Sequence, residues 1–160
     1  MTRARAERTF RAFLSGLLIL AFSGCSRKPT QNVEQDAEEA VFRYLFQQHS
    51  GSLDAVYFIS VPSRRLDNDF LKRFQDNVPR VELNLHGFAG IPIGGGRVVD
   101  KRTGGPATIF SLQKIQWVNR DEVEVQGYLE CGTLCGFGGT FLVRRMHEAW
   151  VVEMTNGYVS

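Results

Sequence analysis

The sequence predicts an α+β domain in which an N-terminal helix and a short second helix pack on a curved antiparallel sheet. Three observations support this fold class. Apolar residues recur at helical spacing over residues 32–48, a nearly all-apolar stretch rich in β-formers follows at 53–61, and alternating polar and apolar residues fill the C-terminal half. Helices mixed with strands and then a long run of strands are typical of α+β architectures.

The first predicted helix, residues 32–48, carries its apolar residues on one face. These are Val33, Ala37, Val41, Tyr44 and Leu45. Asn32 is positioned to cap the helix, with Gln35 reaching back from three residues later. The acidic residues at 34–39 favour the positive end of the helix dipole, and Ser50-Gly51 ends the helix.

Three shorter elements follow. Residues 53–61 form a buried strand that ends at Pro62. Residues 67–76 form the second helix, which ends before Pro79. At 81–86, Val81, Leu83 and Leu85 alternate with polar residues, which predicts a half-buried strand.

The second half of the chain predicts a meander of antiparallel strands. An irregular region at 86–106 comes first, with a short paired segment around 97–99. Turn-forming residues then separate four strands. The four predicted strands are 107–118, 122–131, 140–145 and 150–154.

One buried cluster is expected to join these elements. Its predicted members are Val41, Leu45, Tyr57, Ile59, Phe70, Phe74, Val123, Val125, Phe141, Trp150 and Val152. Truncation of Trp150 to alanine in such a core would cost about 3–5 kcal/mol.

The N-terminus has the architecture of a secretory signal. Four arginines precede an apolar run at 13–22 that is too short to span a bilayer, and Cys25 follows two small residues. The ending LAFSGC resembles the lipobox of bacterial lipoproteins. The resemblance implies cleavage before Cys25 and lipidation of its thiol. Phe22 stands where that family usually has Leu, and cleavage at Ala21 or Ser23 by the ordinary signal peptidase is the alternative.

This resemblance divides the chain into a signal peptide at 1–24, a lipidated tether at 25–31 and a single domain at 32–160. The domain is expected to be exported and held by its lipid at the bacterial cell envelope. In some bacteria an acidic residue after the lipidated cysteine is associated with retention in the inner membrane. Ser26 is not acidic, so the outer membrane, facing the periplasm, is the expected location. Without residues 1–24 the chain has 15 basic and 16 acidic residues, so its charge does not favour binding to nucleic acid.

The order of elements in the domain resembles a cystatin-like or nuclear-transport-factor-like cone. Stretches such as VVDKRTGGPATIF and YLECGTLCG also resemble small uncharacterised bacterial secreted proteins and lipoproteins. These resemblances imply a fold and a setting, and no activity comes with them.

Cys131 and Cys135 lie in a glycine-rich stretch where a metal site, a redox pair, a phosphate-binding loop and a disulfide are alternatives. A structural zinc needs four ligands, whereas His49, His86 and His147 are scattered singly. The glycines precede a strand rather than the helix that a phosphate loop opens. Redox pairs usually have two residues between the cysteines, and here there are three. Export favours a disulfide, and no metal or cofactor is expected.

Two classes of function remain open. The first is a non-catalytic domain that binds an envelope protein or a small molecule. The alternative is a small enzyme whose acid and base residues line the mouth of the cone, with Tyr44, Tyr57, Asp67 and His86 as candidates. A mouth filled by Phe and Leu favours binding, and buried polar groups that converge there favour catalysis.

Overall fold

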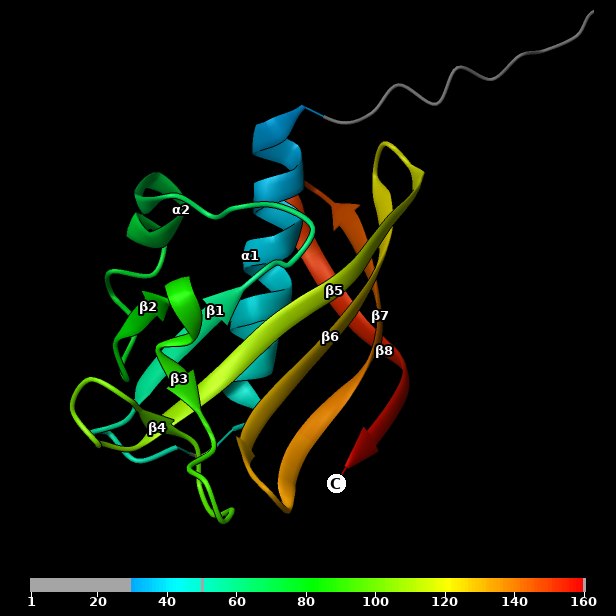
Figure 1. The fold of residues 1–160 in the computed structure, drawn as a ribbon. Coiled ribbons are helices and arrows are strands. Elements are labelled where there is room, and N and C mark those ends of the chain that lie inside the picture. Colours follow the sequence, from blue (N-terminus) through cyan, green and yellow to red (C-terminus); the bar gives the residue numbers. More distant parts are fainter. Residues whose placement is uncertain (1–29, 50, 160) are drawn as a thin grey trace, which may run out of the picture.

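The computed structural model describes residues 30–49 and 51–159 of the 160-residue chain. The predicted signal peptide and Cys25 lie outside these residues, as does most of the predicted tether. The described part is α+β, with two α-helices and a six-stranded mixed sheet (Figure 1). No helix among the described residues is long and apolar enough to cross a membrane.

The elements follow one another in an order close to the predicted one. In chain order they are α1 (Gln31–Gln47), β1 (Val56–Ser60), α2 (Asn68–Lys72), β2 (Val81–Leu83), the 3-10 helix η1 (Leu85–Gly87), β3 (Ala89–Gly90), β4 (Val99–Asp100), β5 (Ala107–Asn119), β6 (Glu122–Gly132), β7 (Cys135–Met146) and β8 (Ala149–Val159).

The large sheet has the strand order β2-β1-β5-β6-β7-β8. β5 to β8 form the predicted antiparallel meander. β1, however, pairs in parallel with both β2 and β5, so the expectation of an antiparallel sheet throughout is wrong. The connections that follow β1 are long enough for the crossovers that parallel pairing requires.

Several predicted boundaries also change. The first helix begins at Gln31 after Thr30, which makes no side-chain cap bond, so the predicted cap by Asn32 is wrong. The strand predicted for 81–86 ends at Leu83, because the chain turns into η1 there. α2 is shorter than the predicted 67–76 helix, and β7 and β8 are longer than expected because hairpin pairing continues past the alternating residues.

α1 packs across one face of the sheet (Figure 1). Aromatic side chains fill the space between the helix and the sheet. This core holds the predicted members from Val41 to Phe141. Trp150 and Val152 pack against this core as predicted, but they are half-buried rather than mostly buried. They lie on β8, the edge strand, which has a neighbouring strand on one side only.

The opposite face of the sheet is partly covered by the segment 85–106. This segment includes η1, β3 and β4, and Figure 1 shows it lying against the β1 and β5 part of the sheet. A second apolar cluster forms there from Val56, Phe58, Ala89, Val98 and Ala107. The region at 86–106 that the sequence predicts as irregular therefore packs on the sheet and forms a small apolar core with it.

Candidate functional site

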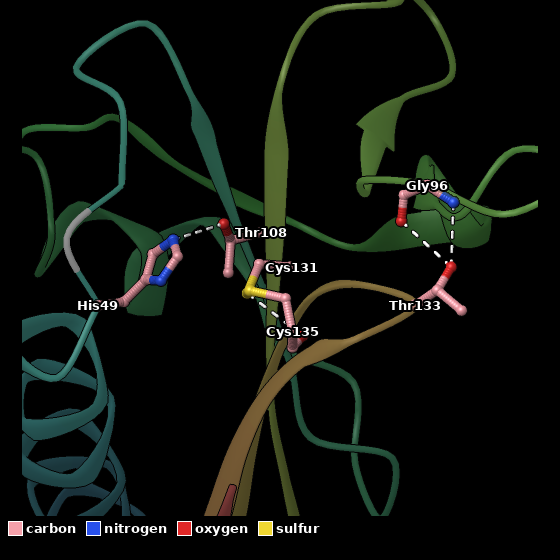
Figure 2. The surroundings of a disulfide bond; sticks show 6 residues. All are labelled: His49, Gly96, Thr108, Cys131, Thr133 and Cys135. Atoms are coloured by element: carbon pink, nitrogen blue, oxygen red, sulfur yellow. Dashed lines mark hydrogen bonds between the residues drawn. A yellow bond between two sulfur atoms is a disulfide. The ribbon is translucent and has the colours of Figure 1, made fainter. Parts of the chain in front are cut away.

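The cysteine pair closes the tip of the β6–β7 hairpin (Figure 2). Cys131 and Cys135 lie at disulfide distance, with their α-carbons 5.1 Å apart. Gly132 pairs directly with Cys135, and a register shift at Cys131 takes that residue out of the regular ladder. The Cys131 side chain is buried against the main core, whereas Cys135 is exposed.

The hairpin tip also holds the segment that covers the sheet. The Thr133 amide donates to the Gly96 carbonyl at 2.9 Å. The Gly96 amide donates to the Thr133 hydroxyl oxygen at 3.0 Å (Figure 2). The Val98 amide donates to the Cys131 carbonyl at 3.0 Å. A β-carbon on Gly132 would lie 2.7 Å from the Gly96 carbonyl oxygen, so only glycine permits this approach.

A cavity of about 320 Å³ lies beside the cysteine pair. His49, Arg97 and Thr108 line it together with both cysteines. His49 Nε2 lies 3.0 Å from the Thr108 hydroxyl oxygen, and burial lowers the pKa of His49, which favours a neutral imidazole (Figure 2). None of the described residues that line this cavity carries a carboxylate, so the histidine has no acidic partner there.

Tyr57, a predicted pocket candidate, is a core residue. Its side chain is only 2% exposed and packs against the rings of Phe46 and Phe110. Its hydroxyl donates to the His49 carbonyl at 3.4 Å, and burial raises the pKa of the phenol. The hydroxyl thus ties β1 to the chain that leaves α1.

Asp67 and His86 have other positions. Asp67 caps α2, because its carboxylate accepts the Phe70 amide at 2.8 Å. The backbone of His86 belongs to η1 rather than to the predicted strand, and its side chain lies outside what the structure describes. Asp67 therefore has a structural partner that explains its position.

Tyr44, the remaining candidate, lines a groove between α1 and the start of β8. This is the largest of the described cavities, at about 450 Å³. Its lining residues are Asp36, Glu39, Ala40, Arg43, Tyr44, Gln47, Glu148, Trp150 and Val152. Tyr57 lines a different cavity with Asn77 and Pro79, so the structure does not bring the predicted candidates together in one mouth.

The walls of this α1–β8 groove carry an ion-pair network. Arg43 donates to Glu39 at 2.8 Å, and Arg73 contacts Asp36 at 2.7 Å and Glu39 at 2.9 Å. The hydrogen bond to Glu39 raises the pKa of Arg43. These contacts join α1 to the end of α2 and hold two carboxylates at the groove.

One buried charge pair was not predicted from the sequence. Glu38 on α1 is 1% exposed, and both its oxygens accept hydrogen bonds from Arg64. The spacing predicts the burial of Glu38, which lies three residues before Val41 and seven before Leu45 on the inward face of the helix, but it does not predict the partner. Burial raises the pKa of Glu38, and the bonds from Arg64 oppose that rise.

No family model, curated protein or solved structure matches this chain. Within 30–49 and 51–159, no three or more His, Cys, Asp or Glu side chains are grouped so that they could hold a metal ion.

Proposed function

We propose that this chain is an exported bacterial lipoprotein whose folded domain serves as a binding module at the cell envelope. The observation that carries the proposal is the LAFSGC ending at Cys25, preceded by a basic segment and a short apolar run. A lipid chain contributes roughly 0.8 kcal/mol per buried methylene, so a multiply acylated Cys25 would hold the protein at a membrane without a spanning helix.

The position of α1 agrees with such an anchor. The helix begins at Gln31, six residues after Cys25, and its 17 residues extend for about 25 Å. The chain enters the domain at one end of α1, and the β6–β7 hairpin lies toward the other end (Figure 1). An anchored domain of this shape would extend away from the membrane, facing the periplasm if the lipid is in the outer membrane.

The interior supports binding rather than catalysis. The space between α1 and the sheet is filled by aromatic rings, including Phe42, Phe46 and Phe110. Within the described chain, no buried side-chain nitrogen or oxygen is left without a hydrogen-bond partner. The same arrangement of α1 across one face of the sheet favours the proposed cystatin-like or nuclear-transport-factor-like cone, with its mouth occupied by the core.

The test compares the full chain with Cys25→Ala in a bacterial host. The wild type should fractionate with membranes, and its N-terminal peptide should carry the mass of the attached acyl chains. Cys25→Ala should appear as unprocessed precursor or as protein released from membranes. Cys131→Ala, which removes a different cysteine, should keep both the lipid mass and the membrane fractionation. An unchanged mass and unchanged partitioning of Cys25→Ala would contradict the proposal.

A further inference from the structure

The α1–β8 groove has an apolar floor that the main core leaves partly open. Tyr44, Trp150 and Val152 lie there half-buried. The Tyr44 ring lies 5.4 Å from Phe141, and the Trp150 ring lies 5.9 Å from Trp117, so both rings are held in place by neighbours. Aromatic side chains that are rigidly held and partly exposed are typical anchors for a binding partner.

The groove adjoins the open edge of the sheet. Residues 149–154 of β8 pair with β7 on one side, and β8 is the last strand of the sheet. The regular edge ends at Thr155, the extra residue of a bulge that lies between the pairs of Met154 and Asn156. Six residues of regular edge thus offer backbone donors and acceptors to an added strand.

The charge of the groove favours a basic partner. Three carboxylates, on Asp36, Glu39 and Glu148, line it, against the guanidinium of Arg43 and that of Arg73, which contacts two of the three. Asp36 and Glu39 are already paired with arginines. Glu148 has no hydrogen bond or ion pair within the described chain, so its carboxylate is free to pair with a ligand.

The backbone at Glu148 lies in the left-handed region. Its φ is 70°, and that of His147 before it is 48°, in a two-residue hairpin turn that Asn-Gly would adopt with less strain. The turn therefore carries a carboxylate where glycine would be the more favourable residue for the backbone.

We propose that this groove binds an extended segment of a partner protein. The segment would add as a strand along residues 149–154, place an apolar side chain on Tyr44 and Trp150, and set a Lys or Arg beside Glu148. A second copy of the chain fits less well, because its own 149–154 stretch, AWVVEM, has no basic residue to set beside Glu148. The inference rests on the proposed binding function and adds to it the surface and the chemistry of the partner.

The test uses the full chain, purified from whichever cell fraction contains it, and two synthetic probes. These are acetyl-Lys-Thr-Val-Thr-Val-Thr-amide, whose Lys and Val side chains share one face of a strand, and its counterpart with Glu in place of Lys. Calorimetry should show binding of the lysine peptide that weakens as salt is raised, and no measurable binding of the glutamate peptide. Amide resonances of residues 149–154 and the Trp150 indole should shift on titration with the lysine peptide.

Variants separate the carboxylate from the turn. Glu148→Gln should weaken binding of the lysine peptide about fivefold, as expected for loss of one charge pair. His147→Asn reduces the backbone strain of the same turn but keeps the Glu148 carboxylate. This variant should therefore bind the lysine peptide with the affinity of the wild type. Glu124→Gln, a carboxylate on β6 outside the groove, should also bind like the wild type.

Three results would overturn the proposal: equal binding of both peptides, no loss in Glu148→Gln, or a dimer in solution whose contact residues are those of β8. None of these readouts depends on the lipid. If the protein fractionates with membranes but does not bind the lysine peptide, the proposed role of the groove is wrong and the proposed lipid anchor at Cys25 is unaffected.

Discussion

His49 shows how one residue depends on elements far apart in the sequence. It follows α1, contacts Thr108 on β5 through its ring, and accepts the Tyr57 hydroxyl at its carbonyl. Its ring also lies 6.1 Å from Phe110. The partly buried imidazole is most stable when neutral, which makes the stability of the fold sensitive to acid.

We expect His49→Gln to reduce the pH dependence of unfolding below neutrality. The folded pKa of His49 is lowered by burial from the ordinary value near 6.5. Between the lowered pKa and about pH 6.5, His49 is therefore protonated in the unfolded chain and neutral in the folded chain. The free energy of unfolding falls as the pH falls through this range. Urea unfolding at pH 4.5–7.5 should show this decline in the wild type and a smaller decline in His49→Gln.

Thr108→Val is the control for this measurement. It removes the hydroxyl that faces His49 and leaves the imidazole buried, so the decline with falling pH should persist. The same pH dependence in wild type and His49→Gln would show that His49 is not the group responsible.

At the scale of the element, β8 contributes less to the core than the sequence predicts. It begins with the apolar run from Trp150 to Val152, which is typical of a buried strand. The strand, however, lies at the edge of the sheet, and Trp150 and Val152 line the α1–β8 groove. Position in the sheet, rather than pattern, decides how deeply Trp150 is buried.

Trp150→Ala should consequently destabilise the protein by less than about 3 kcal/mol, below the range for a fully buried aromatic residue. Phe70→Ala is the comparison, because Phe70 is 0% exposed between Phe42 and Phe74 and should cost about 3–5 kcal/mol. Free energies of unfolding from urea titrations give both values. Equal losses would mean that β8 is buried as deeply as α2.

The β6–β7 hairpin is the element that the cysteine pair constrains. Replacing Cys131 and Cys135 with serine should cost about 2 kcal/mol, because the closed loop is short. The loss should lower the melting temperature by a few degrees and leave the domain folded. Faster hydrogen exchange should appear at the amides of Val98 and Thr133, which the hairpin holds.

The oxidation state is checked by intact mass after alkylation, with and without prior reduction. Protein taken directly from the envelope should gain mass only after reduction. Two thiols that alkylate freely in that sample would contradict the disulfide and would favour the reactive-pair alternative.

At the scale of the whole molecule, location is expected to depend on a residue outside the folded domain. Ser26 follows the proposed lipidated cysteine and lacks the acidic side chain that favours retention in the inner membrane in some bacteria. Ser26→Asp should move the protein from outer-membrane to inner-membrane fractions of a density gradient, and Ser26→Asn should not. Wild-type protein found in the inner membrane would contradict the expected location.

Local patterns predicted a large part of this fold. The helical spacing of Val41 and Leu45 is confirmed by α1, and the alternation around Val123 and Val125 is confirmed by β6. The candidate site was harder to predict. Tyr44 lies on α1 and Tyr57 on β1, and the residues beside them in the sequence do not indicate which cavity each side chain lines. The pairing of Glu38 with Arg64 was missed because a partner 26 residues away leaves no periodic signal.

The sequence by itself determined the helix, the hairpins of β5 to β8 and the spacing of the cysteine pair, because each depends on residues that are neighbours along the chain. Only the tertiary structure decided that β1 lies in parallel between β2 and β5, that β8 forms the edge, and that Trp150 opens onto a groove with Glu148. Strand order and groove lining arise from contacts between distant segments, whose free energies are set by packing against the whole sheet and not by any local pattern.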